Sequence, residues 1–180
     1  MGKLYFRYGA MGSSKTANLL MVHYNYLERG KRPVILKPRI DVRDGINIVK
    51  SRIGLQAECI LVEDFHIESN QYDAILVDEA NFLSAEQIDW LAEICDVYNI
   101  PVLCYGLKTD FQGKLFEGAK RLFELADVIE EIPLFAGAGK KRILMPELWM
   151  EKSYGTENKS LWELMICMFR FAGSILCVAK

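Results

Sequence analysis

The sequence has few of the residues that mark disulfide-rich, metal-binding or secreted proteins. Its five cysteines are scattered and include no Cys-x-x-Cys pair, and its two histidines, His23 and His66, stand alone. Such cysteines are typical of small buried side chains in a reducing compartment, and nothing singles out either histidine as a ligand or base. The first residues are strand-like and lack the pattern of a signal peptide. We therefore expect a cytoplasmic protein.

The sequence also lacks an excess of charge of one sign. It has 22 lysines and arginines against 24 aspartates and glutamates, for a net charge of −2. Nucleic acids and anionic membranes bind proteins through a basic face, so neither is expected as the main partner. A small phosphate ligand held by a local positive site remains compatible with this balance.

Apolar residues make up 51% of the 180 residues, which is enough for a core, and the length suggests one domain with a small appendage. Expected strands alternate with expected helices. The strands are 4–8, 32–37, 58–62, 74–77, 101–107 and 127–132, and the helices are 15–29, 85–98 and 114–125. Ser84 and Gln87 form a capping box before the second helix. This order predicts an α/β fold with a parallel sheet.

Residues 9–16 follow the first expected strand and begin the first expected helix. They fit the phosphate-loop pattern G-x-x-x-x-G-K-[ST] with Gly9, Ala10, Met11, Gly12, Ser13, Ser14, Lys15 and Thr16. In such a loop the backbone amides converge on a phosphate, the lysine reaches the terminal phosphates and the threonine hydroxyl reaches Mg²⁺. Ser14 replaces the second glycine, which costs little if its φ is negative and more if its φ is positive. The alternative is an ordinary glycine-containing turn before a helix.

Two acids, Asp78 and Glu79, directly follow the apolar run 74–77. The run is typical of a buried parallel strand, and its carboxyl end lies on the same edge of the sheet as the phosphate loop. Asp78 is therefore expected to hold Mg²⁺ with Thr16, and Glu79 to act on a nucleophile. The alternative is a solvated turn before helix 85–98. The polar, mostly basic segment 38–54 is expected to be a loop, either solvated or on the phosphate side of the sheet.

A third element makes the pattern more specific. It is Tyr105-Gly106-Leu107-Lys108-Thr109-Asp110-Phe111-Gln112-Gly113. Together with the phosphate loop and the acid pair, it resembles the thymidine kinases of the cytosolic, RecA-like type. Asp41-x-Arg43, Ser51-Arg52-Ile53-Gly54 and the stretch 78–83 add to the resemblance, which covers residues 1 to about 132. It implies a P-loop (RecA-like) parallel sheet with flanking helices.

The resemblance also implies roles for individual residues. Glu79 would be the general base for the 5′-hydroxyl of thymidine, and Thr16 and Asp78 would serve Mg²⁺. ATP would be bound by residues 9–16 and by Asp78, Glu79, Ala80 and Asn81. The substrate would be bound by Met11, Arg43, Phe82, Phe111 and Phe116. The family further implies a homotetramer.

From Pro133 onward the sequence departs from the family pattern. Thymidine kinases of this type end in a small zinc-bound lobe with a loop that closes over the base, but the zinc-ligand cysteines are absent here, so no zinc site is assigned. Residues 161–178 are apolar apart from Glu163 and Arg170. This run is compatible with a membrane span or with a buried or partner-binding helix.

We favour a third interpretation, in which residues 133–180 form a second, degenerate segment translated out of frame. With a suitable choice of codons, dropping two bases turns residues 134–141 into Ile-Cys-Arg-Cys-Gly-Lys-Lys. The same shift turns residues 167–175 into a segment ending Cys-Arg-Lys-His. Both resemble the family's zinc-ligand motifs, in the family's order. A nucleotide sequence without these codons would refute the interpretation.

Loss of a zinc lobe removes folding energy and the cover of the base pocket. The chain as written is therefore expected to bind ATP weakly and to phosphorylate thymidine poorly or not at all. Two other functions remain open at this level. One is a RecA-like ATPase whose hydrolysis drives a conformational change, and the other is a non-catalytic remnant that still binds nucleotide.

Overall fold

The computed structural model describes residues 2–42, 45–67 and 71–133. Arg43, predicted to contact substrate, lies outside these ranges. So do residues 134–180, and with them the predictions of an out-of-frame tail and of an apolar helix at 161–178. No helix within the described ranges is long and apolar enough to cross a membrane.

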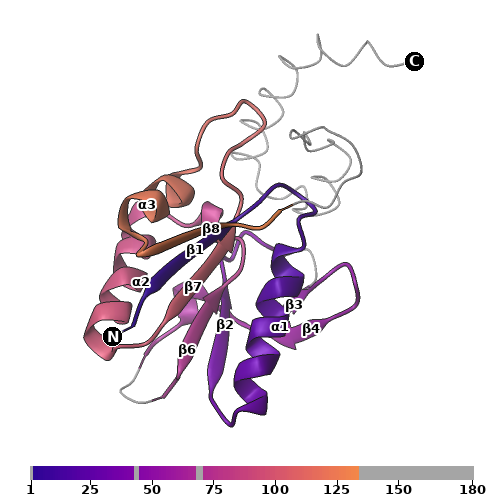
Figure 1. The fold of residues 1–180 in the computed structure, drawn as a ribbon, viewed down its shortest axis with the longest axis vertical. Helices are drawn as coiled ribbons and strands as arrows, with labels where there is room; N and C mark the ends of the chain where they lie inside the picture. The colour runs from indigo at the N-terminus through magenta and orange to yellow at the C-terminus, as the bar shows by residue number, and fades with distance from the viewer. Residues whose placement is uncertain (1, 43–44, 68–70, 134–180) are drawn as a thin grey trace.

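A six-stranded sheet is the centre of the fold (Figure 1). Its strands are β1 (Leu4–Tyr8), β2 (Pro33–Lys37), β5 (Ile60–Leu61), β6 (Ala74–Val77), β7 (Val102–Gly106) and β8 (Val128–Glu131). Their order is β5-β2-β6-β7-β1-β8, and every neighbouring pair is parallel. All four residues of β6 are buried, as expected for an apolar strand covered on both faces. The predicted α/β fold with a parallel sheet is confirmed.

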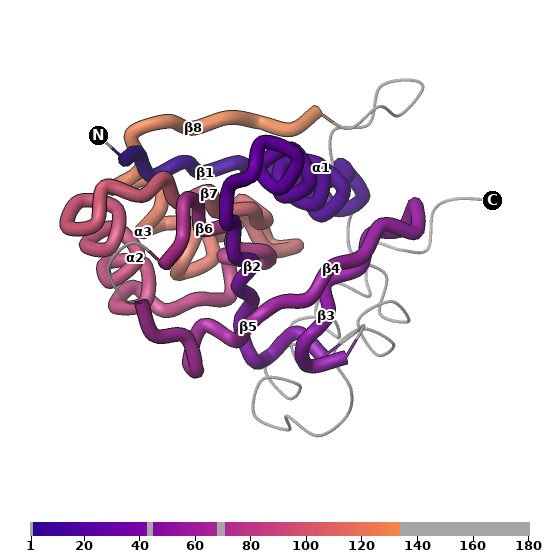
Figure 2. The backbone as a smooth tube through the Cα atoms, turned by 90° about the horizontal axis from the view of Figure 1, so that it is seen from below, coloured from indigo at the N-terminus to yellow at the C-terminus, as the bar shows by residue number. Residues whose placement is uncertain are grey.

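Helices cover both faces of the sheet (Figure 2). Helix α1 (Lys15–Glu28) lies on one face, and α2 (Ala85–Tyr98) and α3 (Glu117–Leu125) lie on the other. The capping box of α2 forms as predicted: Gln87 N–H donates to Ser84 Oγ at 3.3 Å, and Ser84 N–H donates to Gln87 Oε1 at 3.0 Å. Two short 3₁₀ turns, η1 (Val62–Asp64) and η2 (Ala80–Phe82), follow β5 and β6.

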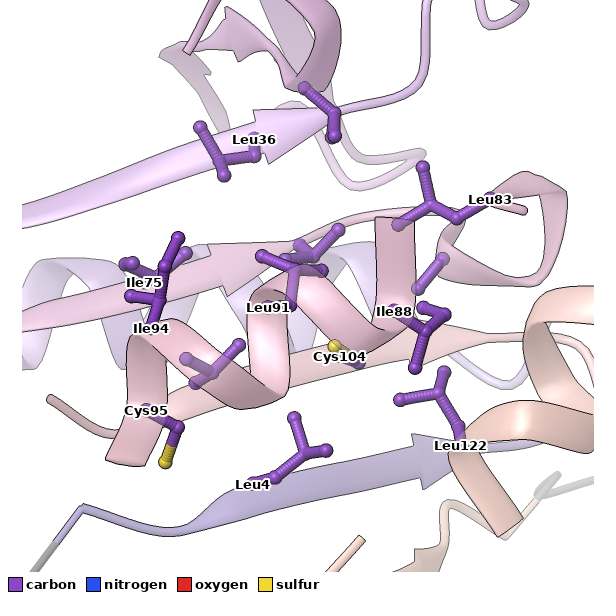
Figure 3. Packing of buried hydrophobic residues seen from close by; sticks show 14 of the residues in the cluster. Leu4, Leu36, Ile75, Leu83, Ile88, Leu91, Ile94, Cys95, Cys104 and Leu122 are labelled. Atoms are coloured by element: carbon purple, nitrogen blue, oxygen red, sulfur yellow. The ribbon is translucent and has the colours of Figure 1, made fainter. Parts of the chain in front are cut away.

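The main core lies between the sheet and helices α2 and α3 (Figure 3). Ile88, Leu91 and Ile94 recur along one side of α2 at intervals of three residues, and all three are buried. They face the sheet, where Ile75 and Cys104 are fully buried. This apolar layer fixes α2 against β6 and β7, and so fixes the loops that leave those strands.

The segment 38–54 was predicted to be a loop, and this is wrong for residues 48–50. Strand β3 (Ile48–Lys50) pairs with β4 (Gln56–Glu58) as a separate antiparallel ribbon on the α1 side. The buried Lys37 of β2 holds β3 and the residues before it. Its Nζ donates to the carbonyl oxygens of Gly45 (2.6 Å) and Ile48 (3.0 Å). Helix α3 also begins at Glu117 rather than at Lys114, because Lys114 closes a turn with Asp110.

Candidate active site

The phosphate-loop sequence folds into a tight loop between β1 and α1. Gly12 has φ +79° and Ser14 has φ +60°, so both adopt the left-handed conformation. Glycine adopts this conformation freely, whereas serine is strained by it. Ser14 therefore has a positive φ, the more costly of the two conformations that were considered for it. Strain of this kind persists where the surrounding structure enforces it, often at functional sites.

Lys15 is folded back over the loop. Its side chain is buried, and its Nζ donates to the carbonyl oxygens of Gly9 (3.2 Å) and Ala10 (2.8 Å). The hydroxyl of Ser13 is also buried, and it has no hydrogen-bond partner among the described residues. A buried polar atom without a partner is a costly feature that a ligand can satisfy. The loop thus presents an amine and an orphaned hydroxyl beside the start of a helix, which suits an anion.

The acid pair lies beside the loop. Asp78 follows β6, is buried, and accepts a hydrogen bond from the Thr16 hydroxyl at 3.1 Å. Its own N–H donates to the Leu36 carbonyl at 2.9 Å, which fixes its backbone against β2. A hydroxyl and a carboxylate are hard oxygen donors, and Mg²⁺ prefers one or two carboxylates completed by water and substrate phosphates. This donor pair fits the predicted Mg²⁺ site. Nowhere in the described ranges do three His, Cys, Asp or Glu side chains gather as a metal-binding group.

Glu79 occupies a second strained position. Its φ is +50°, outside the range that non-glycine residues ordinarily adopt, and it is 8% exposed. Glu79 is one of the residues that line the pocket over the phosphate loop. A carboxylate held there by enforced backbone geometry is a candidate base.

The pocket has a volume of about 110 Å³ and is bounded by three parts of the chain. The phosphate loop and α1 supply one wall, and Glu79 and Leu107 another. The β3–β4 ribbon supplies the third wall with Lys50, Ser51, Arg52 and Ile53. None of these four was predicted as a site residue. The available signals were the basic residues of segment 38–54, its possible place on the phosphate side of the sheet and the motif Ser51-Arg52-Ile53-Gly54, but only the ribbon brings these residues over the loop.

Two predicted ATP contacts, Ala80 and Asn81, are buried beneath the pocket instead of lining it. Asn81 Oδ1 accepts a hydrogen bond from Leu107 N–H at 2.9 Å and so joins the turn after β6 to the loop after β7. The approach is close, because a Cβ added at Gly106 would lie 2.8 Å from Asn81 Oδ1. Asn81 Nδ2 is buried without a hydrogen-bond partner among the described residues, and contact of Ala80 and Asn81 with ATP remains a prediction.

The predicted substrate residues are only partly brought together. The rings of Phe82 and Phe116 pack edge to face with centroids 5.5 Å apart. Phe111 lies in the turn between β7 and α3, which is closed by Asp110, and Met11 lines the pocket itself. Of the predicted substrate residues that the structure describes, only Met11 lines the pocket over the phosphate loop.

A strained loop before a helix, a buried lysine and a threonine–aspartate pair at the carboxyl edge of a parallel sheet define a P-loop nucleotide-binding protein. Comparison with known proteins narrows this class. The sequence model of the family "Thymidine kinase" matches residues 2–141, somewhat past the boundary near residue 132 expected from the motifs. The chain belongs to the thymidine kinase family.

Curated relatives agree with this assignment. A thymidine kinase of Francisella tularensis subsp. holarctica is 46% identical over 151 residues, covering 78% of this chain and 76% of the relative. A thymidine kinase of Enterobacteria phage T4 is 43% identical over 157 residues, covering 82% and 81%. Among solved structures, a DNA replication initiation factor aligns with 74% of this chain and 41% of its own, at 16% identity and a TM-score of 0.45. That likeness is too low to add to the assignment.

Proposed function

We propose that this chain transfers the terminal phosphoryl group of ATP to the 5′-hydroxyl of thymidine. The observation that carries the proposal is the meeting of Thr16 with Asp78 at 3.1 Å, with Lys15 and Glu79 in the same pocket. Family membership supports thymidine as the acceptor, since the relatives that match this chain are thymidine kinases.

The geometry and the family resemblance together support the following roles. The loop 9–16 would bind the phosphates of ATP through its backbone amides, and Lys15 would leave its two carbonyl partners to neutralise the terminal phosphate. Thr16 and Asp78 would hold Mg²⁺, which when bound neutralises phosphate charge. Glu79 would accept the proton of the 5′-hydroxyl while the new O–P bond forms and the bond from the terminal phosphorus to ADP breaks. Met11 and the aromatic residues Phe82, Phe111 and Phe116 would line the nucleoside pocket, and Arg43 remains a predicted contact.

We also propose that the chain is divided into a nucleotide-binding kinase domain, residues 1–132, and an out-of-frame segment, residues 133–180. Restoring the second reading frame would supply the two zinc-ligand pairs of the family. A chain carrying the restored tail should therefore turn over thymidine faster than the chain as written. Equal rates for the two chains would contradict the out-of-frame proposal. A homo-oligomer and a cytoplasmic location also remain predictions.

The kinase activity is tested by measuring ADP release from purified protein with and without thymidine. The expected result is slow release that depends on thymidine and is lost in Lys15→Ala, since the chain as written is expected to phosphorylate thymidine poorly. The matched control is Lys120→Ala, an exposed lysine of α3, which should behave as wild type. ADP release that is unchanged by omitting thymidine would overturn the proposal in favour of an ATPase.

A further inference from the structure

Four polar residues on the α1 face of the sheet form one hydrogen-bonded set. Arg7 on β1 stands between its cross-strand neighbours, Tyr105 on β7 and Glu130 on β8. The Arg7 guanidinium donates to the Tyr105 hydroxyl oxygen at 2.9 Å and to a Glu130 carboxylate oxygen at 2.6 Å. Tyr105 in turn donates to Asn18 Oδ1 at 3.0 Å. The set links three neighbouring strands to helix α1.

Asn18 is the point at which this set reaches the phosphate loop. Its backbone N–H donates to the Ser14 carbonyl at 2.9 Å and closes the first turn of α1. Lys15 and Thr16, which are proposed to contact phosphate and Mg²⁺, lie within that turn. Whatever holds the Asn18 side chain therefore limits how the first turn can move.

The first turn of α1 lacks the side-chain cap that holds the first turn of α2. Helix α2 begins with a capping box, whereas the N-cap residue of α1, Ser14, is in the left-handed conformation and makes no side-chain capping bond. The first N–H groups of a helix lack partners within the helix, so an uncapped turn frays readily. Tyr105 is fully buried, and burial raises the pKa of its hydroxyl, so the group remains a hydrogen-bond donor.

We propose that Arg7, Tyr105 and Asn18 are positioning residues that hold the first turn of α1 in the geometry that binds ATP. The inference rests on the proposed function for the identity of the ligand. Phe82 and Phe116, proposed for the nucleoside, are instead near α3 on the opposite face. The set lies on the other face of the sheet from these two rings, so we expect it to act on ATP binding.

Equilibrium binding of MgATP and of thymidine, measured separately by calorimetry, tests this. Tyr105→Phe keeps the ring but removes the hydroxyl, and Asn18→Ala removes its acceptor. Each is expected to weaken ATP binding by about tenfold and to leave thymidine binding unchanged. The double variant should lose less than the sum of the two single losses, because both changes break the hydrogen bond between Tyr105 and Asn18. Tyr24→Phe, at an exposed tyrosine of α1, is the matched control and should bind both ligands as wild type.

Wild-type ATP affinity in folded Tyr105→Phe and Asn18→Ala would overturn the inference. An equal loss of ATP and thymidine affinity would also overturn it, since that is the result of a general structural role. Should Tyr105→Phe fail to fold, Asn18→Ala decides, because Asn18 is only partly buried. Failure of the proposed function has a different signature: the wild type would bind ATP but release no ADP in response to thymidine.

Discussion

The carboxyl edge of the sheet and the core under α2 follow opposite rules. In the core, Ile75, Leu91 and Cys104 are fully buried and apolar, in regular strands and a capped helix. At the edge, Ser14 and Glu79 adopt left-handed conformations, and Lys15, Asp78 and Asn81 bury polar groups. The core obeys the local preferences of its residues, whereas the edge departs from them.

The difference separates residues that maintain the fold from residues that serve the site. Burial of apolar groups stabilises the folded chain, whereas buried charges and strained backbone cost stability and persist when the surroundings enforce them. Changes in the core should therefore lower stability without a selective effect on ligands. Changes at the edge should alter ligand binding or turnover with little loss of stability.

The largest expected effect is at Glu79. Glu79→Gln keeps the shape of the side chain but cannot accept the proton of the 5′-hydroxyl, so turnover should fall by about 10²- to 10⁴-fold while ATP binding persists. Steady-state ADP release and equilibrium ATP binding measure the two properties. Glu93→Gln, at an exposed glutamate of α2, is the control. Wild-type turnover in Glu79→Gln would remove Glu79 from the mechanism.

A cavity in the core should lower stability and leave the properties of the site in the folded molecule unchanged. Leu91→Ala deletes a fully buried side chain between α2 and the sheet and should lower the free energy of unfolding by about 2–5 kcal/mol. ATP binding per folded molecule should be retained. Val97→Ala, on the same helix at a side chain 66% exposed, should change stability by less than about 0.5 kcal/mol. Urea denaturation of both variants makes the test, and similar losses in the two would contradict the assignment of the core.

A smaller effect, on stability and ATP binding, is expected at Ser14, where the backbone at the edge of the sheet is strained. Ser14→Gly removes the left-handed strain of a non-glycine residue and should raise the free energy of unfolding by about 1 kcal/mol, with tighter ATP binding. Ser84→Gly removes the side chain that caps α2 and should instead lower stability by about a few tenths of a kcal/mol. Thermal melts and ATP titrations of both variants measure these effects. A loss of stability in both variants would contradict the energetic cost assigned to the conformation of Ser14.

The smallest effect concerns α1, which covers the other face of the sheet. Burial lowers the pKa of the His23 side chain on that helix. The neutral form is favoured in the folded state, so stability is present above the unfolded pKa and is lost as the pH falls toward the folded value. Between about pH 7.5 and pH 5.5, the melting temperature of wild type should fall more than that of His23→Gln. His66→Gln, at an exposed histidine, should follow wild type.

Regular, local features of the fold could be predicted from the sequence. The apolar run of β6, the capping box of α2 and the strand–loop–helix order around Lys15 all depend on residues close in the chain. The β3–β4 ribbon was missed because its two strands have only three residues each, which is too short for a clear alternating pattern. Its contribution to the pocket was missed for the same reason.

The sequence by itself determined the α/β class, the phosphate loop and the acid pair, because hydrophobic periodicity and motif spacing are properties of neighbouring residues. The tertiary structure decided the positive φ of Ser14 and of Glu79. It also decided the hydrogen bonds that link Arg7 to Tyr105 and Tyr105 to Asn18. Each of these depends on contacts between segments distant in the chain. Backbone strain and buried hydrogen bonds of this kind exist only once the sheet has brought those segments together.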